Sequence, residues 1–438
     1  MKRLQLHLTT LCILLVAACA NLQGTVERSS ITDSQTWEES FTVDENADFK
    51  LACRESDVFI TTWDQNRVDV KVTLTVEAYE REELDKMLAA FKPSISGSNR
   101  GVSVQNPDCI SETVTNRQTK IRINNQVIKV KSYRYRFEIR MPASNDLNAK
   151  VRFSTIKLGE HRNKVNLELY ECEVTGNGIN SLETIATLKF CDGTLGAARR
   201  MRLNTYESNL TLKTIKSLQS DLKFSNLRFE GITDAEITAY ETDLDLGKTN
   251  LVRLDHNFGK TEISEARRLR LNAYEMELSL GQIDELIISN GRFSKVDVGK
   301  AGYMFMVGYE SSVILNSVDS LELDARFCDV DVGLLQKSLK VSGYESDLRF
   351  SLISAQFNKI SIDARFTQAE LHLAKNSGYQ LESNIAYGQL EIPESDLTGI
   401  RVERKGNNVK ATGRTKDYNG DARVEISGYE TKVRLHRD

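Results

Sequence analysis

Apolar and polar residues alternate in short segments from residue 150 onward, and similar segments return at a nearly constant spacing along the chain. One copy runs from Leu269 to Gly281 and another from Leu321 to Gly333, each with two apolar stretches around a two-residue corner. Alternation with a period of two is typical of β-strands. Strands this short cannot bury their apolar face alone, but parallel stacking of successive coils buries it continuously. The pattern therefore predicts an all-β fold, a parallel β-solenoid of about fourteen to sixteen coils.

Two kinds of residue pair alternate at the corners. Tyr-Glu pairs begin at Tyr170, Tyr206, Tyr240, Tyr274, Tyr309 and Tyr344, and basic-Phe pairs begin at Arg152, Lys189, Lys223, Arg292, Arg326 and Arg365, with Asn257-Phe258 as the exception. A 34-residue coil would stack like-charged Glu residues about 4.8 Å apart, which is unfavourable. A 17-residue coil instead sets each Tyr beside a Lys or Arg, which permits cation–π contact. We therefore expect 17-residue coils whose corner pairs point outward.

These corners are the candidate binding strip. Its members are Tyr206, Tyr240, Tyr274, Tyr309, Tyr344, Arg292, Arg326 and Arg365. Tyr and Arg are enriched at interface hot spots, so the strip could contact a glycan or a partner protein. The alternative is purely architectural, because a periodic corner also fixes the register of the coils.

A row of small residues follows the corner and is expected to point inward. It includes Ser208, Ser225, Ser294, Ser311 and Ser346. Cys172 and Cys191 occupy this row in adjacent coils, which places them within reach of a disulfide. Parallel side chains would strain that bond, so two buried free thiols are the preferred of the two alternatives.

The ends of the repeat have a different pattern. Residues 19–40 are polar and predict a tether, and residues 41–150 predict a first coil at 49–60 followed by an N-terminal cap. The cap contains a strand at 67–77, a helix at 80–92 and a hairpin at 121–127, and the helix is expected to cover the first coil. Residues 151–393 form the repeats, and residues 394–438 predict a C-terminal cap with a last coil at Tyr429.

The N-terminus predicts export and lipid attachment. Residues 1–18 combine Lys2 and Arg3 with an apolar run at 11–18 that is too short to span a bilayer, as in a signal peptide. Residues 16–19, Val-Ala-Ala-Cys, match a bacterial lipobox, which implies lipidation of Cys19 and attachment to a membrane through that lipid. Ala20 favours the outer membrane, and the absence of an acidic run at 21–24 favours a periplasm-facing anchor over the cell surface.

The coil motif, the early strand-helix insertion and the lipobox together resemble a known family. They are similar to the adhesin-type β-solenoid lipoproteins of Bacteroidetes, a domain family of unknown function related in shape to the head domains of auto-transporter adhesins. The resemblance covers residues 41–438. It implies the solenoid fold and an adhesin-like role, and it brings no catalytic residues.

Composition and charge narrow the function further. With 58 Lys and Arg against 62 Asp and Glu, the net charge of −4 gives no drive toward nucleic acid. The histidines at 161, 256, 372 and 436 are separate, and no pair of cysteines has zinc spacing, so no metal or other cofactor is predicted. We therefore expect a non-catalytic binding protein of the cell envelope. The alternatives are a scaffold that assembles end to end and, with less support, a carbohydrate-active enzyme.

Overall fold

The computed structural model describes residues 29–107, 111–115, 118–123, 126–418 and 420–437. The described chain divides into two compact units. The smaller unit comprises residues 29–37, 73–93 and 106–135, and the larger comprises residues 38–72, 94–105 and 136–437. Three strands have residues in both units: β1 (Ile31–Thr42), β4 (Arg67–Ala78) and β10 (Ser132–Pro142).

The smaller unit contains the predicted helix, α2 (Arg81–Ala90). Leu84, Met87 and Phe91 lie on one side of the helix and are buried, and Pro93 follows its end because proline cannot continue a helix. The helix lies against an antiparallel sheet of β7 (Ser111–Thr115), β8 (Gln118–Ile123) and β9 (Gln126–Val130). The predicted helix and hairpin strands are therefore confirmed, whereas the covering of the first coil stays a prediction.

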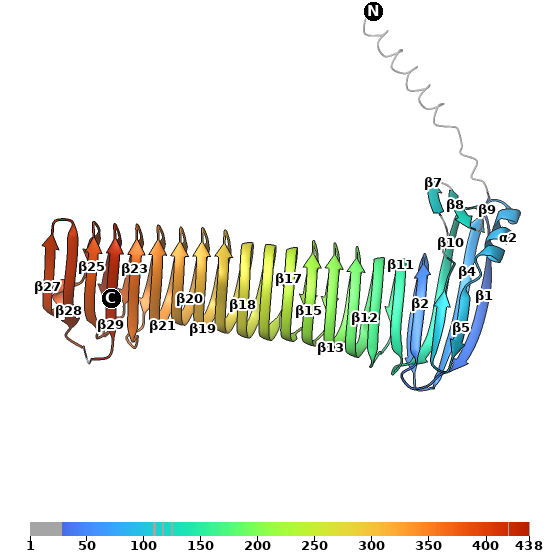
Figure 1. Cartoon of the computed structure of the whole chain (residues 1–438), viewed down its shortest axis with the longest axis horizontal. Coiled ribbons are helices and arrows are strands. Elements are labelled where there is room, and N and C mark those ends of the chain that lie inside the picture. The colour runs from blue at the N-terminus through green and yellow to red at the C-terminus, as the bar shows by residue number, and fades with distance from the viewer. Residues whose placement is uncertain (1–28, 108–110, 116–117, 124–125, 419, 438) are drawn as a thin grey trace, which may run out of the picture. The chain divides into compact units, whose positions relative to one another are not determined.

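The larger unit is a parallel β-solenoid whose coils stack side by side (Figure 1). Its coils and their extensions are β2 (Asp48–Arg54), β3 (Ser56–Trp63), β5 (Ser94–Ser98), β6 (Gly101–Gln105), β11 (Asp146–Leu158), β12 (Lys164–Lys189), β13 (Asp192–Tyr206), β14 (Asn209–Leu212), β15 (Ile215–Lys223), β16 (Asn226–Phe229), β17 (Ile232–Asp245), β18 (Lys248–Arg292), β19 (Lys295–Tyr309), β20 (Ser312–Arg326), β21 (Asp329–Tyr344), β22 (Asp347–Ile353), β23 (Lys359–Arg365), β24 (Gln368–Leu373), β25 (Gln380–Ala386), β26 (Gln389–Glu391), the 3₁₀ helix η1 (Glu394–Asp396), β27 (Leu397–Lys405), β28 (Asn408–Thr415), β29 (Arg423–Tyr429) and β30 (Lys432–Arg437).

The strand register confirms the shorter of the two coil lengths weighed above. Tyr206 pairs with Lys223, and Lys223 pairs in turn with Tyr240, so successive corners are direct neighbours. Inward-facing residues such as Ala273 and Met276 are buried, and the corner pair between them faces outward as predicted. The fold class predicted from the sequence is therefore confirmed.

The N-terminal end agrees with the prediction except in one segment. Strands β2 and β3 form a first coil that pairs with β11, with Arg54 opposite Arg152 at the corner. The other edge of β2 is covered by β6, which forms a hairpin with β5. The predicted tether at 19–40 is wrong over residues 31–40, because these belong to strand β1, which pairs with β4.

The C-terminal coils do not stack in sequence order. Strand β29 pairs with β23 on one side and with β25 on the other, so the coil that comes last in the chain lies between two earlier coils (Figure 1). Strand β30 is inserted in the same way between β24 and β26. Strands β28 and β27 then continue the sheet from β25 in antiparallel fashion. Residues 394–438, predicted as a C-terminal cap with a last coil, thus contain two antiparallel strands that continue the sheet, while the coil of Tyr429 lies inside the stack.

Candidate binding strip at the solenoid corner

Every corner turns through a residue in a left-handed backbone conformation. Within the described residues, sixteen corners have this geometry, with φ between 44° and 60°. The residue is Glu or Phe in all but one of them, the exception being Tyr387. A left-handed conformation is uncommon for residues other than glycine and costs about 1–2 kcal/mol each. The corner must therefore be held by interactions that recur in each coil.

One set of these interactions is a ladder of hydroxyl groups just inside the corner. Ser208 Oγ donates to the carbonyl oxygen of Tyr206 (3.0 Å) and accepts from the backbone N–H of Cys191 in the preceding coil (3.1 Å). Ser294 does the same with Arg292 and Met276. The row of small residues thus satisfies main-chain groups that the sharp turn leaves without strand partners, and each such bond contributes about 1 kcal/mol.

A second set is an unbroken ladder of aromatic rings. The Tyr ring of one coil meets the Phe ring of each neighbouring coil edge to face, with ring centres 5.3–5.7 Å apart and planes at 71–81° from Phe153 through Tyr429. Tyr is the first residue of its corner and Phe the second, so the rings form a zigzag. Such pairs contribute about 0.5–1.5 kcal/mol each beyond burial.

The predicted cation–π contact between Tyr and the neighbouring Arg or Lys is replaced by this ring ladder. Among the described corner residues, the cation found over a ring is Arg54, at 5.7 Å from the centre of Phe153. The left-handed second residue directs Phe toward the Tyr of the next coil, and the basic first residue is left to other partners. Arg326, for example, lies 3.6 Å from Asp324 on its own strand.

The charged groups beside the rings differ between the two kinds of coil. In the Tyr coils the adjacent Glu carboxylate, as the acceptor for the tyrosine hydroxyl, raises the pKa of Tyr240, Tyr274 and Tyr309. In the Phe coils, except at Asn257, an exposed Arg or Lys stands at the first corner position. A ligand lying along the corner would therefore meet aromatic rings flanked by alternating anionic and cationic groups.

The structure brings all the predicted strip residues together. Tyr206, Tyr240, Tyr274, Tyr309 and Tyr344 alternate with corners that include Arg292, Arg326 and Arg365. Rings such as Tyr344 and Phe293 are 36% and 43% exposed, which is enough for contact with a ligand. The sequence prediction missed the part played by Phe, although the strict Tyr/Phe alternation was a sufficient signal. It also missed the hydroxyl ladder, because it considered only the size of the row.

The described cysteines are buried free thiols: Cys53, Cys172, Cys191 and Cys328. Burial raises the pKa of Cys53 to about 12 and also raises that of Cys328. A hydrogen bond with Cys191 lowers the pKa of Cys172. Of the two alternatives for Cys172 and Cys191, the structure has the free thiols. Cys19, the predicted lipidation site, lies outside the described residues.

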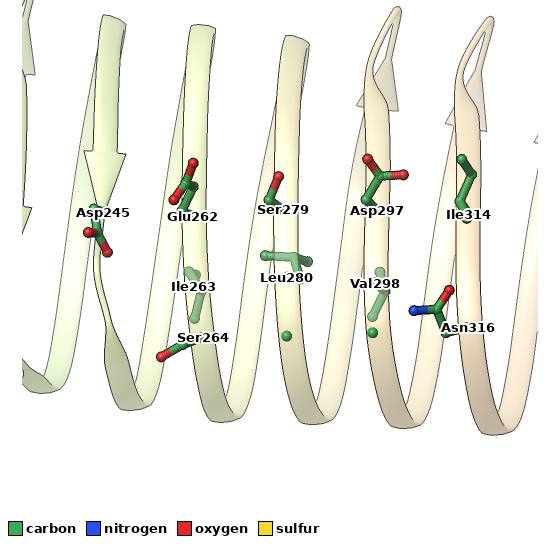
Figure 2. Close-up of a pocket in the computed structure, with 12 residues that line it drawn as sticks. Asp245, Glu262, Ile263, Ser264, Ser279, Leu280, Asp297, Val298, Ile314 and Asn316 are labelled. Carbon is green, nitrogen blue, oxygen red and sulfur yellow. The ribbon is translucent and has the colours of Figure 1, made fainter.

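A shallow depression on one strand face is the other candidate site. Figure 2 shows Asp245 and Glu262 on adjacent coils and Asp297 two coils beyond Glu262, above a row that includes Ser264 and Asn316. Each of these carboxylates has a basic partner: Arg228 lies 3.3 Å from Asp245, Lys260 lies 2.6 Å from Glu262 and Lys295 lies 3.4 Å from Asp297. Paired carboxylates on an open face do not favour general acid catalysis.

The four described histidines fall into two groups. His161 and His256 are buried, with Nδ1 hydrogen-bonded to Gly159 O (3.1 Å) and to Thr261 Oγ1 (2.9 Å). Burial lowers the pKa of His256 to about 4. His372 and His436 were expected to be separate, but they are direct neighbours in paired strands. The order of the C-terminal coils brings them together, and the linear repeat gives no sign of that order.

Comparison with protein-family models gives no match, and comparison with curated proteins gives none either. A solved structure that matches is that of a "putative cell adhesion protein" from Clostridium sporogenes, with 10% sequence identity. The match covers 92% of this chain and 100% of the other, at a TM-score of 0.14. With identity and TM-score this low, the likeness decides nothing about function, and membership of the Bacteroidetes family stays a prediction.

One further observation concerns the membrane. In the part of the chain that the structure describes, no helix is both long and apolar enough to cross a bilayer.

Proposed function

We propose that this chain is an exported, lipid-anchored protein of the cell envelope that binds an extended glycan through its corner strip, without catalysis. The observation that carries the proposal is the continuous zigzag of half-exposed Tyr and Phe rings, flanked by carboxylates and cations. Aromatic rings pack against the apolar faces of sugars, and Glu, Tyr, Lys and Arg supply hydrogen bonds for sugar hydroxyls.

The backbone conformation at the corners supports the proposal that these side chains contact a ligand. Glycine would occupy the left-handed position without strain, yet Glu and Phe stand there in nearly all of the described corners. The ring ladder compensates part of that strain and at the same time leaves the aromatic residues partly exposed. The same periodicity suits a polymer, because one unit of the ligand can repeat its contacts at each pair of coils.

The proposed lipid anchor depends on the sequence around Cys19. An outer-membrane, periplasm-facing location is also part of the proposal. Replacing Cys19→Ser and following incorporation of a labelled fatty acid would test the anchor. We expect the parent chain to be labelled and the variant to be unlabelled. Equal labelling of both would contradict the anchor while leaving the binding strip open to its own test.

An end-to-end scaffold is less well supported. The outermost strand, β27, is an exposed edge that contains Arg401, Glu403, Arg404 and Lys405. Charges on an edge strand oppose pairing with another chain. Sedimentation at increasing protein concentration would separate the two functions, since a scaffold lengthens with concentration and a monomeric binder does not.

The binding test uses variants that keep the ring ladder intact. The full chain is applied to immobilised envelope glycans, beside a triple variant Glu241→Gln, Glu275→Gln and Glu310→Gln, and a second triple variant Tyr240→Phe, Tyr274→Phe and Tyr309→Phe. Both retain the aromatic rings; the first removes the negative charge of the carboxylates and the second removes the tyrosine hydroxyls. We expect capture by the parent and at least a tenfold weaker affinity for each variant, about 1.4 kcal/mol.

A matched control removes the same number of carboxylates from the strand face. It carries Glu262→Gln, Asp297→Asn and Asp331→Asn, which lie away from the corner. This control should bind like the parent. Equal capture of the parent and both strip variants would place binding elsewhere, and no capture of the parent would refute the proposed function for the glycans tested.

A further inference from the structure

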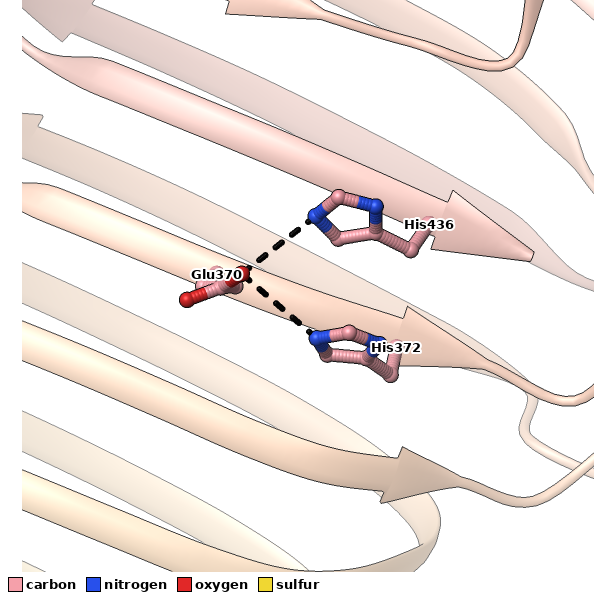
Figure 3. A group of neighbouring side chains, drawn as sticks. All are labelled: Glu370, His372 and His436. Atoms are coloured by element: carbon pink, nitrogen blue, oxygen red, sulfur yellow. Dashed lines mark ion pairs between the residues drawn. The ribbon is translucent and has the colours of Figure 1, made fainter. Parts of the chain in front are cut away.

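Three side chains with metal-ligating atoms meet at the inserted C-terminal coil. His372 on β24 and His436 on β30 are directly opposite each other in parallel register, and Glu370 lies two residues before His372 on the same face. Figure 3 shows Nε2 of both imidazole rings directed toward the Glu370 carboxylate. Within the described residues, this is the group of His, Cys, Asp and Glu side chains whose geometry suits an ion.

The distances agree with those of a coordinated metal ion. Glu370 Oε1 lies 3.6 Å from His372 Nε2 and 3.4 Å from His436 Nε2. Two ligands bound to a tetrahedral Zn²⁺ at about 2.1 Å are about 3.4 Å apart from each other. The rings stack with their centres 4.5 Å apart and their planes at 18°, and the Nε2 atom of each ring lies near the same carboxylate oxygen of Glu370. All three ligand atoms lie within 4.8 Å of one another.

One atom of the group is incompletely satisfied as it stands. His436 Nε2 is shielded from solvent and has no hydrogen-bond partner, although the ring as a whole is half-exposed. A buried polar atom without a partner is unfavourable, and a metal ion at this point would satisfy it. The basic neighbours of Glu370 form ion pairs with other carboxylates. Arg434 lies 3.3 Å from Glu391, and Arg349 lies 3.9 Å from Asp331. The Glu370 carboxylate is thus available as a ligand.

We propose that Glu370, His372 and His436 bind one Zn²⁺ ion, with water at the remaining position. Two imidazoles and a carboxylate are ligands that Zn²⁺ accepts, and three protein ligands leave one site of a tetrahedron open. The site has a clear structural role because its ligands come from strands that are neighbours in space but distant along the chain. The ion joins β30 to β24 and fixes the coil that inserts out of sequence order.

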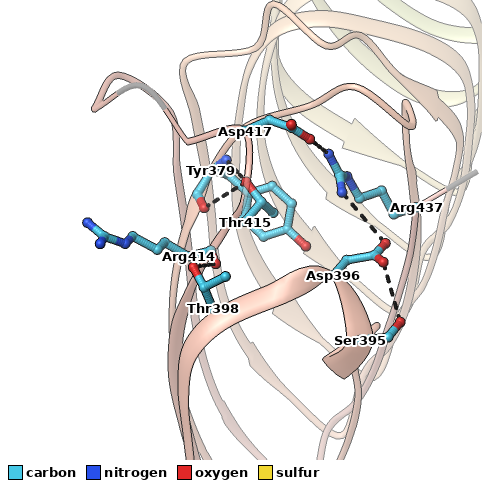
Figure 4. Close-up of polar contacts among 8 residues, drawn as sticks. All are labelled: Tyr379, Ser395, Asp396, Thr398, Arg414, Thr415, Asp417 and Arg437. Carbon is cyan, nitrogen blue, oxygen red and sulfur yellow. Dashed lines mark hydrogen bonds and ion pairs between the residues drawn. The ribbon is translucent and has the colours of Figure 1, made fainter.

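The end of β30 is held from the other side by an ion-pair network. Arg437, whose side chain is only 8% exposed, bridges Asp417 and Asp396, the latter at 3.6 Å (Figure 4). His436 therefore belongs to a strand end that is positioned by packing and charge before any ion binds. A site on a paired, anchored strand has its ligands preorganised, which favours binding.

The first test is a calorimetric titration with ZnCl₂. The full chain is freed of metal with a chelator beforehand. We expect one saturable Zn²⁺ per chain. His372→Gln, His436→Gln and Glu370→Gln should each weaken binding by about tenfold or more, since even an outer partner of a metal ligand is worth that much. The matched control is Glu425→Gln, because Glu425 is a carboxylate of equal exposure (38% against 37%) that pairs with Lys359 in the same region.

A second readout reports on the clamp itself. Zn²⁺ should slow amide hydrogen exchange of residues 432–437 in the parent and in Glu425→Gln, and should leave exchange unchanged in His436→Gln. Thermal melting without zinc checks that the variants fold. The proposal is overturned if no saturable binding is found, or if the His372 and His436 variants bind Zn²⁺ as tightly as the parent does.

Discussion

Coils stack in different orders in two regions of the solenoid. One region is the regular run from Tyr206 to Tyr344, and the other is the C-terminal end from Lys359 to Arg437. In the regular run each coil pairs with the coils next to it in sequence, as when Tyr309 pairs with Arg326. At the C-terminal end Arg365 pairs with Tyr429, although the coil of Ala386 lies between them in the sequence. Both regions keep the same corner, with its ring ladder, although only one keeps the order of the chain.

This difference shows which features of the corner are local. Phe366 contacts Tyr429 at 5.7 Å and 78°, a geometry like that of Phe293 with Tyr309 in the regular run. The edge-to-face contact therefore depends on the conformation of the two corner residues and not on how the chain connects them. The order of the coils along the chain instead affects the folding rate, because contacts between residues distant in sequence require closure of a long loop.

The largest expected effect comes from removing the inserted coil, residues 421–438. The deletion exposes partners of Val424, Ile426, Val433 and Leu435, whose burial contributes about 6–12 kcal/mol in all. It also separates β23 from β25, so residues 359–415 should lose hydrogen-exchange protection while residues 206–344 keep theirs. Exchange measured by mass spectrometry checks this, and loss of protection throughout the solenoid would show that the two regions unfold as one.

Lowering the pH is expected to reduce the folding stability of the regular run, because it favours protonation of His256. This ring is 1% exposed and occupies the place held by Ala239 in the preceding coil. Burial lowers its pKa to about 4, whereas an unfolded histidine titrates near 6.5, so the neutral form is favoured in the folded state. Stability is complete above about pH 6.5 and falls as the pH drops toward 4, by at most about 3 kcal/mol.

The measurement is thermal melting of the parent and of His256→Gln from pH 7.5 to 4. The variant should lose less stability over that range, although it is expected to be less stable at pH 7.5 because it perturbs the buried contact with Thr261. An identical pH dependence in both chains would mean that another group, such as buried His161, determines the acid response.

The smallest of the three effects concerns the hydroxyl ladder. Ser294→Ala leaves the N–H of Met276 without its acceptor and should cost about 1–3 kcal/mol. The exposed Ser312→Ala should stay within about 0.5 kcal/mol of the parent. Denaturant unfolding measures both. A neutral Ser294→Ala would show that the row only needs to be small, as the sequence alone suggests.

Much of the fold was predictable because the interactions that define it are local and repeated. The alternation of apolar residues gave the strands, and the like-charge cost of stacked Glu residues selected the correct coil length. Helix α2 followed from the spacing of Leu84, Met87 and Phe91. The insertion of β29 between β23 and β25 was not predictable, since the Arg365, Ala386 and Tyr429 coils have equivalent patterns and only their packing selects the order.

The same limit applies to the sites. The members of the corner strip share a repeat position, so sequence alignment of the coils found them. The contact geometry was missed because it depends on the left-handed second residue, which turns Phe toward Tyr. His372 and His436 hold the same position in their coils, but in sequence order the coil of Ala386 stands between them. Their contact is a consequence of the exchanged order.

The inserted coil also bears on how a growing chain reaches its final form. A chain made from its N-terminus can complete each regular coil as soon as the next copy of the repeat emerges. Strands β23 and β25, by contrast, have no common partner until residues 423–437 have been synthesised. The C-terminal end therefore waits with open edges during synthesis, and a nascent chain halted before residue 423 would expose them to other chains.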